Sequence, residues 1–106
     1  MRDDFHTPWS DTVDLLSFAD NQDADGYGVE PAGRRTLFCN WYEGVSQNEF
    51  YLSSKQGLQA TDSVEIQRVD YEGERWAEFV GRRYHVIRSF PASFDTLYLI
   101  LSEVVR

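Results

Sequence analysis

Apolar and polar residues alternate along most of the chain with the period of two that is typical of β-strands. Six segments carry this pattern, at residues 12–19, 34–42, 62–70, 75–80, 83–90 and 96–105. In the last segment Leu97, Leu99 and Leu101 share one face, which we expect to point into the core. Short turns, among them Gly81-Arg82, separate the third, fourth and fifth segments, and this spacing is typical of an antiparallel meander.

The division of side chains between strand faces predicts how the strands are covered. In the second strand Cys39 and Trp41 share one face and Tyr42 lies on the other, so both faces are partly apolar. This pattern predicts a strand that is central in the sheet or covered on its outer side. In the fifth strand, strict alternation places Arg88 on the same face as Val86.

One segment between the second and third strands carries helix signals instead. Ser46 and Glu49 have the spacing of a capping box, in which each side chain accepts a backbone N–H at the helix start. Gly57 suits the left-handed residue that ends many helices. These signals predict a short α-helix over residues 47–56, about 15 Å long at ~1.5 Å per residue. Such a helix is marginal alone, so we expect it to pack against the β-structure or a neighbouring subunit.

Together the segments predict a mainly β fold, a small six-stranded antiparallel β-barrel or rolled sheet with one short α-helix between strands two and three. Apolar residues on both faces favour closure, because an open sheet leaves its edges exposed. A length of 106 residues fits a single domain over residues 1–106, in which residues 1–10 form a flexible arm. Residues 20–33 are turn-forming throughout and predict a long acidic loop.

The charge and cysteine content exclude several classes of protein. The net charge of −8 disfavours direct binding to nucleic acid, which normally requires a basic surface. The single cysteine, Cys39, excludes an internal disulfide and fits a reducing compartment. The sequence contains no apolar run near the ~18 residues of a membrane-spanning helix and no signal-peptide pattern. We therefore expect a soluble intracellular protein.

The acidic loop resembles a calcium-binding loop only in part. Asn21, Asp23, Asp25 and Gly26 match positions of an EF-hand loop, but Ala32 stands where a bidentate glutamate is required. Strands rather than helices are also expected on both sides. The pattern therefore favours a solvated surface loop, and we expect no metal site.

The remaining candidates for chemistry do not form a catalytic constellation. The two histidines, His6 and His85, lack carboxylates at catalytic or ligand spacing, and His85 is interpreted as a surface or interface side chain. Cys39 alternates with apolar residues and is interpreted as a small buried hydrophobe. Arg82 and Arg83 lie at a hairpin tip, where charge is usually solvated. We expect neither an enzyme nor a cofactor.

A series of short motifs follows one another along the chain. They are Glu49-Phe50-Tyr51, Gly57-Leu58, Asp70-Tyr71-Glu72-Gly73-Glu74, Gly81-Arg82-Arg83-Tyr84-His85-Val86-Ile87-Arg88 and a closing strand over residues 97–103. In their order and spacing these motifs resemble the head closure proteins of long-tailed bacteriophages, also called head–tail adaptors or stoppers. The resemblance covers about residues 12–103. The chain departs from the family after Leu58, where members often carry proline, and in residues 91–94, where the family loop is usually more polar.

The resemblance implies a small β-barrel-like sheet with a helix in the connection between its second and third strands. It also implies a structural role in the virion, after assembly in the host cytoplasm. Copies would form a homo-oligomeric ring, twelve-fold as in the family, below the portal and adaptor proteins. This ring would close the channel after packaging, retain the DNA and offer a docking surface to the tail or a tail-completion protein. DNA would be met only as channel content, and no membrane would be involved.

Two segments are candidates for the functional contacts. In the helix segment, to which the resemblance points as the stopper, the candidate ring or channel contacts are Glu49, Phe50, Tyr51 and Lys55. In the acidic loop, the candidate residues for docking on the adaptor or the tail are Asp20, Asp23, Asp25, Tyr27 and Glu30. An acidic segment that faces the channel would repel packaged DNA. Whether Phe50 and Tyr51 pack on the core or reach across a ring interface is left open by the sequence.

An alternative function belongs to another class. A small acidic β-barrel can also serve as a peptide- or protein-binding module, for example by adding a peptide strand to an exposed sheet edge. This alternative requires no catalytic residue, and it agrees equally well with the acidic charge and the aromatic content of 15%.

Overall fold

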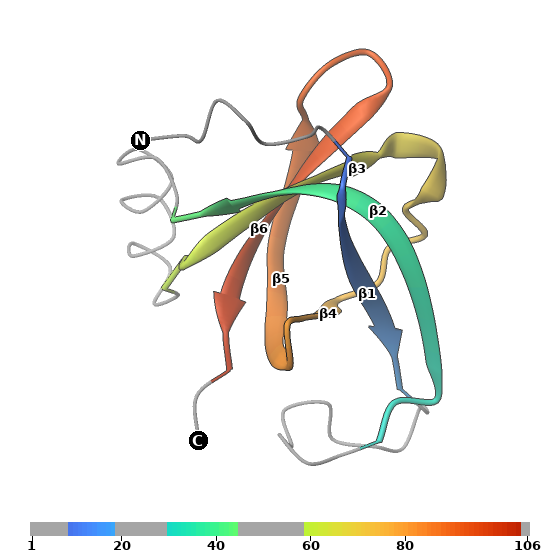
Figure 1. Cartoon of the computed structure of the whole chain (residues 1–106), viewed down its shortest axis with the longest axis vertical. Coiled ribbons are helices and arrows are strands. Elements are labelled where there is room, and N and C mark those ends of the chain that lie inside the picture. The colour runs from blue at the N-terminus through green and yellow to red at the C-terminus, as the bar shows by residue number, and fades with distance from the viewer. Residues whose placement is uncertain (1–8, 19–29, 45–58, 105–106) are drawn as a thin grey trace.

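Six antiparallel strands form a closed β-barrel in the computed structural model, which describes residues 9–18, 30–44 and 59–104 (Figure 1). The strands are β1 (Asp11–Ser17), β2 (Gly33–Glu43), β3 (Asp62–Gln67), β4 (Trp76–Phe79), β5 (Arg82–Pro91) and β6 (Thr96–Glu103). Their order around the barrel is β1-β2-β3-β6-β5-β4, and β4 pairs with β1 to close it. The predicted mainly β fold with six antiparallel strands is therefore confirmed, and of the two predicted forms it is the closed barrel rather than the rolled sheet.

The barrel interior is filled by the inward-facing residues of all six strands. The buried cluster consists of Val13, Leu15, Cys39, Trp41, Val64, Ile66, Ala77, Tyr84, Val86, Leu99 and Leu101. It includes the predicted inner faces of the second and last strands, and Leu97 packs against it. Alternation was sufficient for these assignments because each of these strands keeps one face toward a single core.

A second apolar group covers part of the outer wall. Leu16 is fully buried although its neighbour Leu15 points into the core, and it is paired with Trp76 across β1 and β4. Phe18 packs edge-to-face on Trp76 at 6.0 Å between ring centroids. The half-buried His85 lies 4.8 Å from the same indole ring. These side chains pack on one another outside the barrel. This outer packing explains why some strands carry apolar residues on both faces.

The third strand is shorter than predicted and has a different neighbour. It ends at Gln67, and Arg68–Asp70 form a single 3-10 turn, η1. The alternation continues past Gln67, but the N–H of Arg68 donates to the carbonyl of Asp95 at 2.8 Å instead of continuing a strand ladder. The chain then crosses one end of the barrel to β4, and β3 pairs with β6. The predicted meander of strands three to five is therefore wrong in its first step.

The hairpin of β4 and β5 corrects two details of the prediction. Phe79 pairs with Arg82, so the turn residues are Val80 and Gly81 rather than Gly81 and Arg82. A β-bulge lies between Val86 and Arg88. Because a bulge inserts one residue, it reverses the alternation, and Arg88 pairs with the outward-facing Ile100.

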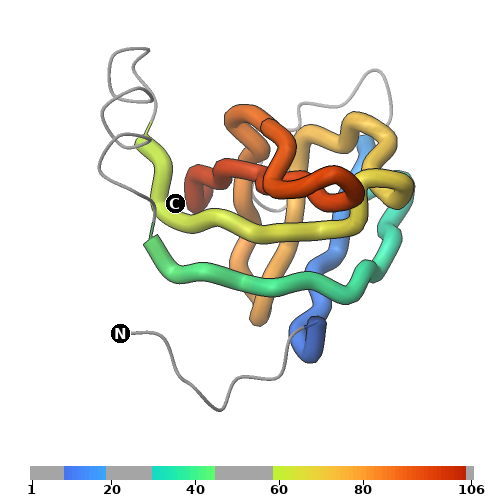
Figure 2. Tube along the Cα trace, turned by 90° about the horizontal axis from the view of Figure 1, so that it is seen from above, coloured from blue at the N-terminus to red at the C-terminus, as the bar shows by residue number. Residues whose placement is uncertain are grey.

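The predicted α-helix at residues 47–56 and residues 1–8 of the predicted arm, 1–10, lie outside the described residues. Trp9, in the described part of this arm, donates its N–H to the Asn40 side chain at 2.6 Å. The two strands that flank residues 45–58, β2 and β3, run side by side along one wall (Figure 2). In the part of the chain that the structure describes, no helix has the length and apolar character that a membrane crossing requires.

Candidate functional site

Most of the predicted contact residues lie outside the described part of the chain. This applies to the ring or channel candidates Glu49, Phe50, Tyr51 and Lys55, and to the docking-loop candidates Asp20, Asp23, Asp25 and Tyr27. It applies also to the partial calcium pattern at residues 21–26. Glu30, the remaining docking candidate, is described and exposed. The candidate site is therefore built from the described residues at which these two segments leave the barrel.

The acidic loop leaves the barrel where β1 ends and β2 begins. The N–H of Ala32 donates to the carbonyl of Ser17 at 2.7 Å, and Ser17 pairs with Gly33 in the ladder. A Cβ atom on Gly33 would lie only 2.6 Å from the Ser17 hydroxyl, so glycine permits this close approach. The two ends of the loop are thus held together at this end of the barrel.

The connection that contains residues 45–58 leaves from the other end of β2. Glu43 pairs with Asp62, and the N–H of Gly44 donates to the Asp62 carboxylate at 3.1 Å. Thr61 donates its N–H to the carbonyl of Leu101 at 2.8 Å. The two candidate segments are therefore separated by the whole of β2, 11 residues, which is roughly 30 Å of extended strand.

The end of the barrel near Glu43 is open and has an aromatic floor; we call it the barrel mouth. Trp41 and Phe79 stack with 3.8 Å between ring centroids and 5° between ring planes. Tyr84 meets Trp41 edge-on at 5.1 Å. These rings line a cavity of about 590 Å³, a volume within the range of small-ligand pockets.

The rim of the barrel mouth is acidic. Glu43, Asp62 and Glu103 line the cavity together with one cation, Arg82. Arg82 is largely exposed, and its Nε lies 3.9 Å from the Glu103 carboxylate. Burial raises the pKa of the Tyr84 hydroxyl, and the carboxylates of Asp62 and Glu103 raise it further while Arg82 opposes them. The rim therefore places three carboxylates and one guanidinium around an aromatic floor.

The opposite end of the barrel is closed by the crossover from η1 to β4, at the Tyr71-Glu72-Gly73-Glu74 motif. Tyr71 packs against the core and donates its hydroxyl to the carbonyl of Glu74 at 2.7 Å. The Arg35 guanidinium lies 2.6 Å from the Glu74 carboxylate, and the hydrogen bonds that it donates to this carboxylate hold the pKa of Arg35 above its ordinary value. The motif therefore has a clear structural role, because it anchors the segment that covers this end.

Sequence reasoning missed Arg35, although a signal was present. Arg35 has the same strand phase as Leu37 and Cys39, which point inward. A cation on the inner face of a barrel strand requires a partner, and a carboxylate of the crossover provides it. The inward-facing position of Arg35 in the alternation could have predicted that it has an anionic partner. Which carboxylate is that partner depends on the crossover, and the alternation did not reveal the crossover.

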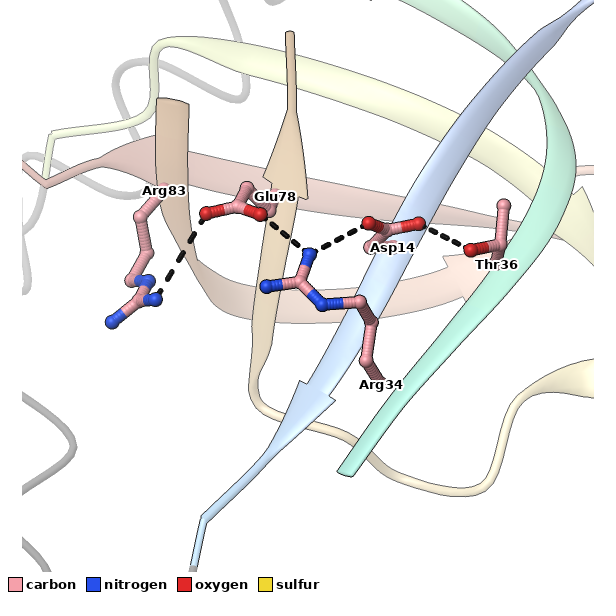
Figure 3. Close-up of polar contacts among 5 residues, drawn as sticks. All are labelled: Asp14, Arg34, Thr36, Glu78 and Arg83. Carbon is pink, nitrogen blue, oxygen red and sulfur yellow. Dashed lines mark hydrogen bonds and ion pairs between the residues drawn. The ribbon is translucent and has the colours of Figure 1, made fainter. Parts of the chain in front are cut away.

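A row of charged side chains crosses the outer wall over β2, β1, β4 and β5 (Figure 3). Asp14 and Glu78 are paired directly across the β1–β4 seam. Arg34 lies between them and donates to Asp14 at 2.7 Å and to Glu78 at 2.5 Å. Hydrogen bonds to Glu78 and then to Asp14 raise the pKa of Arg34.

This row stabilises the closure of the barrel. Like charges directly opposite each other on neighbouring strands are destabilising, and Arg34 offsets that repulsion. Arg83 lies 3.9 Å from the second oxygen of Glu78, and Thr36 donates to Asp14 at 2.6 Å. Both carboxylates thus contact protein donors. No group of three or more His, Cys, Asp or Glu side chains among the described residues could hold a metal ion.

Cys39 has the environment that the sequence predicts. It is fully buried in the core beside Trp41 in β2. Burial, and to a smaller extent the Asp11 carboxylate, raises the pKa of its thiol to about 12. A thiol with this pKa is protonated at neutral pH, so Cys39 is a packing residue rather than a nucleophile.

Comparison of the chain with models of known protein families found no match, and comparison with curated proteins found no significant match. Function is therefore inferred from the sequence motifs and from the geometry of the barrel. Two features of this geometry matter most. The two candidate segments leave from opposite ends of β2, and one of these ends opens into an acidic cavity with an aromatic floor.

Proposed function

We propose that this chain is a structural protein of the head–tail connector of a long-tailed bacteriophage. In this role copies form a ring below the portal and adaptor proteins. The ring closes the DNA channel after packaging, retains the DNA and provides the surface on which the tail or a tail-completion protein docks. The chain acts without catalysis or a cofactor, and packaged DNA is only the content of the channel.

One observation carries the proposal beyond the sequence motifs. The connection after β2 and the acidic loop before β2 leave the barrel at opposite ends of an 11-residue strand. A connector subunit contacts a head-side protein and a tail-side protein, and it therefore needs binding segments at separate positions. We assign residues 45–58 to the gate or ring contact, and the acidic loop to the adaptor or the tail.

The outer surface also suits an assembly with several neighbours. Large apolar side chains are exposed on four different elements: Phe38 on β2, Val69 in η1, Val80 in the β4–β5 turn and Phe94 in the β5–β6 loop. A cyclic ring requires two different contact faces on every subunit. Val69 and Phe94 lie where η1 meets the β5–β6 loop, and Val80 lies beside the barrel mouth, so apolar anchors are available at two separate places, and such side chains often occupy the centres of interfaces.

The decisive experiment removes the chain from the phage that encodes it. We expect negative-stain electron microscopy to show packaged heads that leak DNA and lack tails. Supplying the chain from a plasmid should restore tailed particles. Normal tailed particles in its absence would overturn the proposal. Gene order offers a quicker check, because portal and capsid genes should lie upstream and tail genes downstream.

A second candidate function is a peptide- or protein-binding module, and the cavity at the barrel mouth favours it. Each of the six strands has a neighbour on both sides, so the closed barrel does not support binding by addition of a strand to a free edge. A partner would bind in the mouth instead. Normal phage morphology without the chain, together with recovery of a specific partner on the mouth, would favour this function over the connector.

A further inference from the structure

We propose that the barrel mouth is a binding site for an arginine side chain of a partner protein. The half-buried ring of Phe79, which stacks on the buried Trp41, would receive the guanidinium group, and the rim carboxylates of Glu43, Asp62 and Glu103 would bind its N–H donors. This inference goes beyond the proposed function and does not depend on it, because the site belongs to the barrel itself.

The cavity has the size and shape for one side chain and part of its backbone. Its volume of about 590 Å³ lies in the middle of the range for small-ligand pockets. The half-buried Phe79 stacks face to face on the buried Trp41, with 5° between the ring planes, so the ring of Phe79 is the flat face left toward the cavity. A planar guanidinium stacks on such a face, whereas a lysine ammonium is a compact and more strongly hydrated charge.

Charge complementarity selects a cation. Among the residues that line the cavity are three carboxylates and one guanidinium, so the lining has an excess of negative charge. Burial raises the pKa of the Tyr84 hydroxyl below this rim, and the carboxylates of Asp62 and Glu103 raise it further. An arginine can accept both stacking and bidentate carboxylate contacts, which together give more geometric selectivity than charge alone.

Arg82 provides an internal test of the site. Its guanidinium lies at the rim, 3.9 Å from Glu103, with 67% of the side chain exposed to solvent. It lines the cavity and shares a side-chain hydrogen bond with Tyr84, so it reduces the negative potential that an incoming cation would meet. Removing this charge should strengthen binding, which is an effect that a merely structural role of Arg82 does not predict.

The test is a titration of the full ¹⁵N-labelled chain with the peptide acetyl-Gly-Arg-Gly-amide, followed by NMR. We expect chemical-shift changes at the Trp41 indole N–H and at Thr61, Asp62 and Glu103. The same peptide with citrulline, which is neutral and nearly the same shape, should bind at least about fivefold more weakly. The lysine peptide should bind more weakly than the arginine peptide.

Variants then assign the binding to the mouth. Glu103→Gln should weaken binding by about threefold, and Arg82→Gln should strengthen it by a similar factor. Glu72→Gln is the matched control, because Glu72 is an exposed carboxylate at the opposite end of the barrel, and it should leave binding unchanged. Backbone spectra confirm that each variant is folded. Three results would each overturn the proposal. They are equal binding of the citrulline and arginine peptides, chemical-shift changes confined to residues away from the mouth, and no binding of the arginine peptide by the folded wild-type chain or by any folded variant.

Discussion

A few charged side chains determine how each end of the barrel is finished. At the closed end, Arg35 connects β2 to the crossover through Glu74, and it also donates to the carbonyl of Asp70 at 2.5 Å. At the open end, Glu43, Asp62 and Glu103 face solvent around an aromatic floor and have only Arg82 among them. The same type of charge therefore stabilises the fold at one end and leaves a potential binding surface at the other.

Glu74→Gln should lower the free energy of unfolding by about 1–2 kcal/mol, since it removes the charge from a hydrogen-bonded ion pair whose carboxylate is largely buried. Glu72→Gln is the control. Its carboxylate is 72% exposed and lies 4.0 Å from Arg35, so the change should cost less than about 0.5 kcal/mol. Urea unfolding of both variants measures the difference. Equal stability of the two would show that the Arg35–Glu74 pair does not hold the crossover.

Cys39 should make the protein less stable at alkaline pH. The thiol has its ordinary pKa of 9.0 in the unfolded chain and a pKa of about 12 in the core. Between these values the native state holds a proton that the unfolded state has lost, so the free energy of unfolding falls as pH rises. The fall is about 2 kcal/mol at pH 10.5, at ~1.4 kcal/mol per pH unit.

Urea unfolding at pH 8.0 and pH 10.5 measures this effect. The variant Cys39→Ala is less stable at both values because it leaves a cavity, but it should lose less stability between them. Burial also raises the pKa of Tyr71 and Tyr84, so these two side chains add a loss in the same direction above pH 10 in both proteins. An identical loss in the wild-type chain and in Cys39→Ala would contradict the assignment to the thiol.

At the scale of elements, the strands and the β4–β5 hairpin could be predicted, but the partner of β3 and the closure of β4 on β1 could not. Alternation depends on a residue's own side chain, so it identified six strands and the inward faces of most of them. The bulge after Val86 depends on pairing with β6, and the end of β3 at Gln67 depends on the hydrogen bond from Arg68 to Asp95. The local alternation of side chains carries no information about either contact. The turn was misplaced by one residue because glycine was taken as its first residue, whereas Val80 occupies that position.

Val80→Asn should stabilise the β4–β5 hairpin. Val80 and Gly81 both have positive φ, 51° and 77°, as a two-residue type I′ turn requires. A β-branched residue is strained there, whereas asparagine adopts this conformation readily. We expect a gain of about 1 kcal/mol and a rise in Tm of about 5 °C by thermal unfolding. Gly81→Ala should have the opposite sign. A fall in Tm for Val80→Asn would mean that the exposed valine contributes packing that outweighs its strain.

At the scale of the whole molecule, the candidate site is a product of topology. The residues of the barrel mouth come from the ends of β2, β3, β4, β5 and β6 and from the segments beside them, and they converge only because β3 pairs with β6 and β4 closes on β1. No spacing in the sequence brings Glu43 near Glu103. The motif resemblance did identify the crossover and the β4–β5 hairpin as notable segments, but not that they finish opposite ends of the barrel.

This topology makes the two candidate segments separable by mutation. Deletion of residues 23–28 shortens the acidic loop but leaves its base, where Ala32 donates to Ser17 and Gly33 pairs with the same residue. Shortening a loop changes its closure entropy only slightly, so the unfolding transition should move little. Ring assembly should persist, because we assign ring contacts to residues 45–58 at the other end of β2. Docking to the adaptor or the tail should fail.

Phage particles that carry the deletion provide the measurement, with Phe50→Ala as the contrasting variant. For the loop deletion, electron microscopy should show packaged heads that carry the ring but no tail. For Phe50→Ala it should show heads without the ring. Circular dichroism of each purified chain must show an unchanged barrel, because otherwise the phenotype reflects unfolding. If the deletion abolishes folding, the acidic loop has a structural role. If the deletion gives tailed, infectious particles, the acidic loop is not part of the docking surface. Either result would leave the barrel mouth, which is built from other residues, as the place to look for the partner.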